Sequence, residues 1–280
     1  MKNYIFPIYL CCTAVLWIAC SAPVKPDRRI TVSIEPQRYF VDCLVDTLFD
    51  VQALVPPGSS PENYDPDPQQ MAQLARSQAY FLIGNIGFET VWKTRLQANN
   101  PQVRFFDNST DVIPIADDAH GQSADPHTWT SPKQARIIVQ NMYQALLQLD
   151  SENQIHYRRN LEKLLAVIDT TDREVSDLLA QAPQKSFIIY HPALSYLARD
   201  YGLTQYAIEH DGKEPSPNHL KQLVDIAQAE HIRIIFIQEE FDRKNAEIIA
   251  RETGCRLVTI QTLSYHWREE ILRIARILSE

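Results

Sequence analysis

The sequence predicts an α/β fold of two lobes, each built on a mainly parallel sheet flanked by helices, with one long rigid helix joining them. Two observations predict this class. Short apolar runs alternate with amphipathic stretches before residue 108 and again after residue 185, which is the pattern of βαβ units. Between these regions, about 30 residues from Ser151 contain neither Gly nor Pro and repeat aliphatic residues at helical spacing.

The first lobe is expected to alternate strictly between strand and helix. Its clearest helix signal is Asp67-Pro68-Gln69-Gln70, where Asp67 suits the N-cap, Pro68 the first turn and Gln70 the third position of a capping box. Strands are expected at 28–36, 50–57, 79–84 and 102–107, and helices at 37–49, 67–78, 88–99 and 133–150.

The second lobe is expected to follow the same alternation. Strands are expected at 186–191, 203–209, 232–238 and 255–261, and helices at 192–202, 216–230, 243–254 and 266–279. The whole chain then divides into a signal peptide (1–19), a linker (20–28), an N-terminal lobe (29–150), a connecting helix (151–183) and a C-terminal lobe (184–280).

The first 20 residues predict export. One early Lys precedes an apolar run from Tyr4 to Cys20, which is short for a membrane span and suits a signal peptide. Because the run ends on Ala19 and Cys20, it resembles a bacterial lipoprotein signal in which Cys20 becomes the lipid-bearing first residue. Simple secretion and an uncleaved anchor are the alternatives. The two cysteines beyond the signal, Cys43 and Cys255, are expected to be free thiols, with a disulfide between them as the alternative.

Candidate ligands stand just beyond predicted strand ends. Glu62 follows the second strand inside the proline-rich stretch "PPGSSPENYDPDP", His127 lies in "DPHTWTSP", and His191 closes "SFIIYH". Parallel sheets place functional residues at the carboxyl ends of their strands, so two facing lobes would bring these side chains into one cleft. His and carboxylate are ligands of zinc, manganese and iron. The spacings form no local metal motif, and a structural His bonded to backbone is the other interpretation of His191.

Five stretches resemble one known family in the same order along the chain. They are "VPPGSSPENYDPDPQQMAQLARSQAYFLIGNIGFE", "DPHTWTSPKQARIIVQNM", "YHPALSYLARDYGL", "GKEPSPNHLKQLVDIA" and "FDRKNAEIIARETG". They resemble the solute-binding proteins of zinc and manganese ABC importers, and the resemblance covers roughly residues 30–280. It implies two rigidly linked lobes with a metal between them. It also implies a monomeric, non-enzymatic receptor at the bacterial cell envelope, lipid-anchored or periplasmic, that serves a membrane permease.

The resemblance carries over to individual positions. Glu62 stands where the family's Pro-His-x-Tyr motif has its first histidine ligand, and His127 and His191 match the second and third ligands. Gln261 stands at the fourth position, where the family commonly has Asp or Glu, and an amide is a poor metal ligand. Three protein ligands and a water are common in zinc chemistry, so the site is expected to persist, with Glu209 as a possible neighbour of the ligands.

Zn²⁺ is the expected ion. Mn²⁺ or Fe²⁺ is the alternative, because the carboxylate of Glu62 is a harder ligand than the usual imidazole. A secreted zinc metalloenzyme, with Glu239 or Glu209 as its base, is the alternative from another class. The short loop with Asp117, Asp118 and His120 resembles a remnant of the family's metal-collecting loop, or is a solvated acidic loop. A net charge of −8 without a Lys/Arg cluster argues against nucleic-acid binding.

Overall fold

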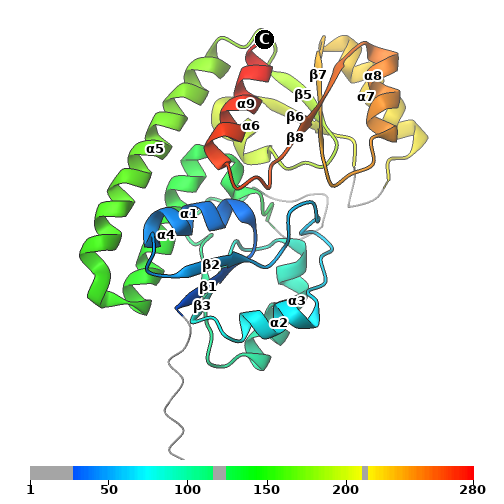
Figure 1. Ribbon diagram of the computed structural model, residues 1–280. Coiled ribbons are helices and arrows are strands. Elements are labelled where there is room, and N and C mark those ends of the chain that lie inside the picture. The colour runs from blue at the N-terminus through cyan, green and yellow to red at the C-terminus, as the bar shows by residue number, and fades with distance from the viewer. Residues whose placement is uncertain (1–27, 116–123, 210–213) are drawn as a thin grey trace, which may run out of the picture.

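The computed structural model describes residues 28–115, 124–209 and 214–280. Within them, two four-stranded parallel sheets form two lobes, and helices pack around and between the sheets (Figure 1). The predicted fold class is therefore confirmed, including the long helix between the lobes. The division of the chain into a signal peptide, a linker, two lobes and a connecting helix, with the residue limits given above, stays a prediction.

The N-terminal sheet has the strand order β2-β1-β3-β4, with every pair parallel. Each strand is only four residues long, and β3 is buried along its whole length because it lies inside the sheet with helices over it. The elements of this lobe are β1 (Arg29–Val32), α1 (Glu35–Val45), β2 (Asp50–Ala53), α2 (Pro68–Leu74), β3 (Ala79–Leu82), α3 (Gly87–Asn99) and β4 (Arg104–Asp107).

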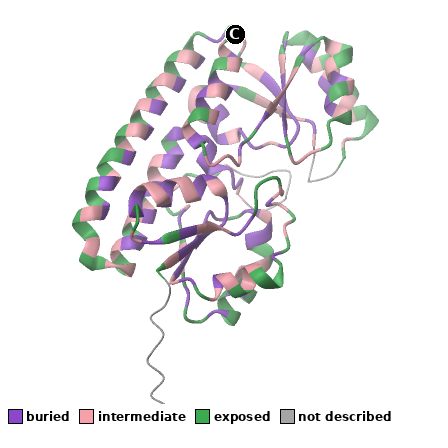
Figure 2. Ribbon diagram, viewed as in Figure 1, coloured by how far each residue is buried: buried purple, intermediate pink, exposed green. Residues whose placement is uncertain are grey.

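Two helices connect the lobes. α4 (Pro132–Leu149) packs along α5 (Gln154–Ala180), which has 27 residues and is preceded by a short 3₁₀ turn at Ser151–Asn153. Figure 2 shows α5 with exposed residues on its outer side and buried residues facing the body of the protein. Its repeating aliphatic residues therefore form the buried stripe that helical periodicity predicts.

The C-terminal sheet repeats the parallel arrangement with the order β6-β5-β7-β8. Residues of β5 alternate between its two faces, since Phe187 and Ile189 join the main core while Ile188 joins a second core under α7 and α8. The elements are β5 (Ser186–Ile189), α6 (Ser195–Tyr201), β6 (Thr204–Ala207), α7 (Pro217–Ala229), β7 (Ile234–Gln238), α8 (Lys244–Thr253), β8 (Arg256–Ile260) and α9 (Trp267–Ser279).

Several predicted helices are shorter than the sequence suggested, and two of these differences concern the segments around the candidate ligands. The helix predicted at 67–78 begins on its Asp67 cap but ends at Leu74. The helix predicted at 192–202 begins only at Ser195, because residues 191–194 form a turn in which the amide of Ala193 donates to the carbonyl of His191 at 2.7 Å. Both differences lie beside candidate ligand segments.

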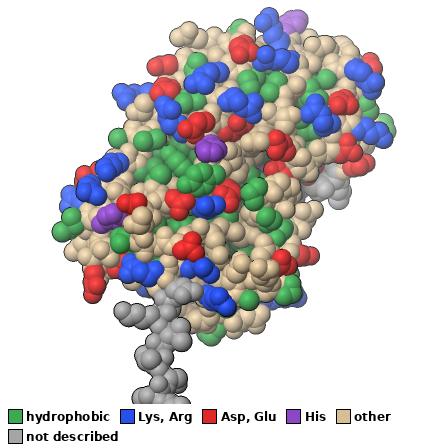
Figure 3. All heavy atoms as spheres, in the orientation of Figure 1, with side chains coloured by type: hydrophobic (Ala, Val, Ile, Leu, Met, Phe, Trp, Pro, Cys, Tyr) green, Lys and Arg blue, Asp and Glu red, His purple; other side chains and the backbone are tan. Residues whose placement is uncertain are grey.

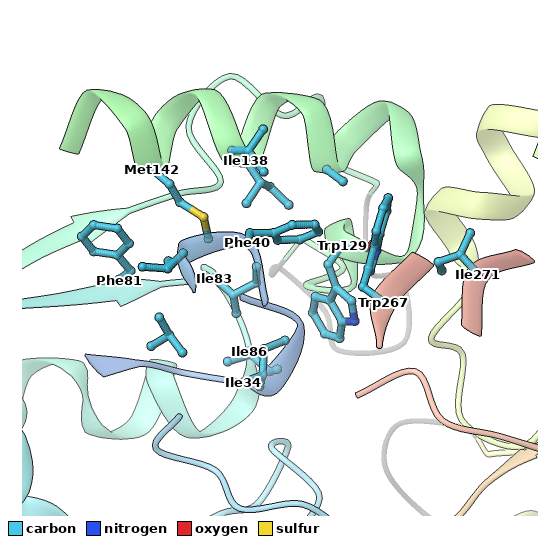
Figure 4. Close-up of a cluster of buried hydrophobic side chains, with 14 of the residues drawn as sticks. Ile34, Phe40, Phe81, Ile83, Ile86, Trp129, Ile138, Met142, Trp267 and Ile271 are labelled. Atoms are coloured by element: carbon cyan, nitrogen blue, oxygen red, sulfur yellow. The ribbon is translucent and has the colours of Figure 1, made fainter. Parts of the chain in front are cut away.

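One main core runs through both lobes. It extends from β1 and β3 across α4 and α5 to β5, α6 and α9. At its centre Trp267 donates from Nε1 to the carbonyl of Trp129 at 2.7 Å, Trp129 donates to the carbonyl of Thr262 at 2.7 Å, and the Trp267 ring packs against Phe40 (Figure 4). A continuous close-packed core resists independent motion of the lobes, in line with the rigid link expected from the sequence.

The described surface is mixed in charge. On the face shown in Figure 3, acidic and basic side chains are interspersed, and hydrophobic side chains gather between α1 and the start of α9. Among the described helices, none has the length and apolar character needed to cross a bilayer. Cys43 and Cys255 are both free thiols, as expected, although Cys43 is only partly buried.

Candidate metal centre

Three of the predicted residues meet between the lobes. Glu62 comes from the loop between β2 and α2, His127 from the segment before the 3₁₀ turn Thr128–Thr130, and His191 from the turn after β5. Both histidines are buried, with 6% and 7% of their surface exposed, whereas the Glu62 side chain is 31% exposed. Glu62 and His127 are 65 positions apart along the chain, and His127 and His191 are 64 apart, so the fold brings distant residues together. Of the three, only His191 lies directly beyond a strand.

The three potential ligand atoms form a triangle of the size of a zinc site. His127 Nε2 lies 3.1 Å from His191 Nε2, and Glu62 Oε1 lies 3.6 Å and 3.8 Å from these two atoms respectively. The centre of such a triangle is about 2.0 Å from each corner, which matches the 2.0–2.2 Å bonds of zinc to His and carboxylate. The three atoms could contact one ion without rearrangement.

Each histidine is oriented by a carboxylate on its other ring nitrogen. Asp125 Oδ1 lies 2.9 Å from His127 Nδ1, and Glu209 Oε2 lies 3.1 Å from His191 Nδ1. A carboxylate beside Nδ1 favours the tautomer with its proton there, which directs the Nε2 lone pair into the cavity. The two lone pairs and the Glu62 carboxylate then converge on one point, an arrangement that a cation stabilises.

Glu62 Oε1 gives an independent sign of a cation site. The oxygen is buried and, among the described residues, no hydrogen-bond donor reaches it. A buried carboxylate oxygen without a donor is costly, since desolvation is not offset by a hydrogen bond. A metal ion at the centre of the triangle would satisfy this oxygen, so the residues present fit a divalent metal.

The His127 segment folds around its own aspartate. Asp125 Oδ1 also accepts from the backbone amide of His127 at 2.7 Å, and Thr130 Oγ1 donates to the His127 carbonyl at 2.8 Å. Burial opposes ionisation of Asp125, but the attraction of His127 and its hydrogen bonds outweigh burial and hold the pKa of this carboxyl below its usual value. The Trp129 ring is fully buried, with its centre 5.3 Å from that of the His127 ring, so it packs beneath the segment.

The His191 segment is fixed by Gln238 at the end of β7. Gln238 Nε2 donates to the carbonyl of His191 at 2.8 Å, and its Oε1 accepts from the His191 amide at 3.4 Å. The Phe241 ring stacks on the imidazole with 5.1 Å between ring centres. Backbone and ring are therefore both held before any ion arrives.

The site opens into a small cavity, in which the centre of a water-sized sphere has about 20 Å³ to move. Besides the three candidate ligands, it is lined by Gln238, Glu240 and Phe241 from the C-terminal lobe and by the proline-rich loop. Burial raises the pKa of Glu240 above its usual value, the nearby Glu239 adds to this, and His191 partly offsets it. Glu240 is thus a second carboxylate facing the cavity, though it lies outside the three-residue cluster.

Gln261 lies apart from the cavity lining. Its side chain is exposed, and Nε2 donates to Glu239 Oε1 at 2.7 Å while its backbone amide donates to Glu270. The structure therefore brings together Glu62, His127, His191 and, on the far side of His191, Glu209, but not Gln261. The residues Cys20, Asp117, Asp118, His120, His210 and Asp211 lie outside the described residues.

Sequence reasoning missed three neighbours of the ligands. Asp125 could have been found, because it stands two residues before His127, where an aspartate can bond the following backbone amide and ring. Gln238 offered a weaker signal as the polar residue that ends an apolar strand. Glu240 offered no signal of its own in the sequence, and only the fold shows that the turn after β7 lines the cavity.

Comparison with known proteins also indicates a metal-binding protein. A family model described as zinc-uptake complex component A, periplasmic (ZnuA), matches residues 30–270, and the chain belongs to this family. It is 26% identical to a putative metal-binding protein of Chlamydia trachomatis, over 93% of this chain and 94% of that one. It is also 26% identical to the high-affinity zinc uptake system protein ZnuA of Bacillus subtilis, over 89% of this chain and 83% of that one.

A solved structure supports the fold in detail. The chain is similar to a crystal structure of ZnuA with a TM-score of 0.86 and 36% identity, covering 90% of this chain and 98% of that chain. The family resemblance expected from the sequence motifs is therefore confirmed, and with it the class of protein.

Proposed function

We propose that this protein is an exported receptor that binds one Zn²⁺ through Glu62 Oε1, His127 Nε2 and His191 Nε2 and delivers it to an ABC importer permease. The triangle of these three atoms, whose centre is about 2.0 Å from each corner, carries the proposal. Membership in a family of zinc-uptake components supports both the ion and the permease partner.

The chemistry follows from the donor set. Two neutral imidazoles and one carboxylate would leave a monocationic zinc complex with room for a water as fourth ligand, since Gln261 points elsewhere. Because the histidines must be neutral to bind, protons compete with the metal for both imidazoles, and metal binding releases protons. Release to the permease requires a lobe rearrangement that the permease-bound state favours over the free one.

The location follows from the N-terminal sequence and the family. The family is described as periplasmic, which supports export. The run ending at Cys20 supports a lipid anchor at that residue, so the mature chain would be held at the bacterial cell envelope as a monomer. Mass spectrometry of the membrane fraction tests the anchor, because a diacylated N-terminal Cys20 is expected and an unmodified soluble chain would contradict it.

A competitive metal titration of the purified protein tests the site. We expect zinc binding in the nanomolar range or tighter, and a loss of about 100-fold or more for Glu62→Ala. Glu152→Ala, which removes an exposed carboxylate far from the cavity, is the matched control and should bind as the wild type does. An unchanged affinity in Glu62→Ala would refute the proposed ligand set.

Manganese or iron is the second candidate ion. The observation that favours it is Glu62, since two histidines and one carboxylate with open positions form the donor set typical of iron(II) sites, and carboxylate is the harder ligand. Tighter binding of Mn²⁺ or Fe²⁺ than of Zn²⁺ in the same titration would establish it.

We also propose that the chain is no enzyme, as its family consists of binding components. Three protein ligands and a cavity resemble a hydrolytic zinc site, and Glu239 or Glu209 would have to serve as base. Glu209 is bonded to His191 Nδ1 and Glu239 to Gln261, so both carboxylates already have partners. Hydrolase activity that disappears on chelation would contradict this.

A further inference from the structure

The loop that carries Glu62 packs against the first turn of α3 so closely that residue 87 has no room for a side chain. A Cβ atom built on Gly87 would lie 2.0 Å from the carbonyl oxygen of Glu62 and 2.8 Å from its Cα. The next residue, Phe88, donates its backbone amide to the carbonyl of Pro61 at 3.0 Å. Gly87 is required here by space, since its backbone conformation is one that any residue adopts.

The turn that presents Gly87 is itself fixed by a buried carboxylate. Glu89 is 2% exposed, and its two oxygens accept from the backbone amides of Ile83 and Gly84 at 2.9 Å each. Ser33 Oγ, which pairs with Tyr80, donates to the same carboxylate. Glu89 takes no part in the metal centre, so its burial needs another explanation.

The turn between β3 and α3 has an unfavourable backbone conformation that requires stabilising contacts. Gly84 and Asn85 both adopt left-handed φ values, +86° and +59°, which the chain rarely takes in succession. Because a carboxylate that accepts two backbone amides ties both ends of such a turn, Glu89 holds residues 83–87 in the conformation that meets Glu62. We call residues 83–89 the β3–α3 corner.

We infer that Gly87 and Glu89 are positioning residues of the metal centre, which act through the backbone of Glu62 to set how close its carboxylate comes to the two histidines. The inference rests on the proposed function. The Glu62 side chain has no hydrogen-bond donor of its own on Oε1 among the described residues, so the place of its backbone decides where that oxygen lies.

A small shift of the Glu62 backbone should have a large effect on zinc affinity. Real Cβ atoms almost never approach another atom within 3.0 Å, so Gly87→Ala must shift the Glu62 peptide by about 1 Å. Metal–ligand distances tolerate only about 0.2 Å. The contacts that orient the histidines come from Asp125, Glu209 and Gln238, which lie outside the corner. Their half of the site should therefore remain in place, and the carboxylate alone should be displaced.

The test is a double-mutant cycle measured by zinc competition. Gly87→Ala is expected to weaken zinc binding about 10- to 100-fold in the wild-type background and to have no further effect in Glu62→Ala, because the ligand that it displaces is already missing. The visible spectrum of bound Co²⁺ should change in Gly87→Ala in the same direction as in Glu62→Ala. Thr94→Ala, an exposed change one turn further along the same helix, is the matched control.

A second variant keeps the inference testable if Gly87→Ala fails to fold. Glu89→Gln keeps the shape of the side chain but offers only one carbonyl oxygen for two backbone amides, so we expect a loss of about 10-fold in zinc affinity, again only when Glu62 is present. Equal losses with and without the Glu62 side chain would overturn the inference and leave the metal site standing. A wild-type protein that binds no zinc would overturn the proposed function itself.

Discussion

The two sides of the proposed metal centre are held in different ways. On the histidine side, each imidazole has a carboxylate on Nδ1, and the His191 backbone is fixed at both its amide and its carbonyl by Gln238. On the other side, Glu62 comes from a proline-rich loop, is about one-third exposed and is positioned through its backbone.

We infer from this difference that the histidine side determines the overall affinity for metals, whereas the Glu62 side determines the selectivity among them. The histidine side is built before the ion arrives, so it supplies binding that needs little reorganisation. The Glu62 side carries the one carboxylate among the three proposed ligands, and the position of that carboxylate depends on a neighbouring turn. We therefore expect changes on the histidine side to lower the affinity for every metal, and changes on the Glu62 side to alter the order of preference among metals.

The largest effect is expected from removing a histidine. His191→Ala should weaken zinc binding by about 60- to 700-fold, because a zinc site worth about 10–16 kcal/mol over four ligands loses about 2.5–4 kcal/mol with each one. Manganese binding should fall by a comparable factor. A loss confined to zinc, measured by competitive titration of both ions, would break the proposed separation.

The corner under Glu62 predicts a pH-dependent stability. Burial raises the pKa of Glu89 from 4.5 to about 7, with its hydrogen bonds acting in the opposite direction. Between these values the folded protein keeps a proton that the unfolded chain has lost, so the free energy of unfolding decreases as the pH rises, by about 3 kcal/mol in total. Glu89→Gln cannot titrate and should lack this decrease.

Urea unfolding of the metal-free wild type and of Glu89→Gln at pH 4 to 8 measures this effect. Comparing the two proteins cancels the contribution of the histidines and of other groups. Parallel pH profiles for the two proteins would mean that Glu89 does not titrate in this interval.

Changing a carboxylate that orients a histidine should have the next largest effect. Asp125→Asn should weaken zinc binding about 10- to 100-fold, because an amide beside Nδ1 no longer selects the tautomer that presents Nε2 to the cavity. Asp50→Asn, at an exposed aspartate paired with Arg29, is the control and should leave binding unchanged. Zinc and manganese should again be affected alike.

Replacing Glu62 by histidine tests the other side of the site. Glu62→His should raise the ratio of zinc to manganese affinity by about 10-fold, since imidazole is a softer ligand than carboxylate. Paired titrations with the two ions measure the ratio directly. If the zinc and manganese affinities changed by the same factor, Glu62 would contribute to the overall affinity for metals and not to the selectivity between them.

The same contrast explains what the sequence could predict. Periodicity and the Gly- and Pro-free stretch after Ser151 predicted the parallel sheets and α5, because burying an apolar face is a local requirement of each element. The strand-end rule then brought Glu62, His127 and His191 together. It could not foresee Gly87 or Glu89, because their role depends on contact between two loops that pattern alone does not relate.

The fourth ligand position should show the smallest effect. Gln261→Ala is expected to change zinc affinity by less than about threefold, because the exposed side chain bonds Glu239 and does not line the cavity. Glu240→Gln should cost more, about 1 kcal/mol or fivefold, since it removes a negative charge that faces the ion across the cavity. A loss of tenfold or more in Gln261→Ala would mean that this side chain reaches the ion in the bound state, and that the C-terminal lobe is the more adjustable side of the site.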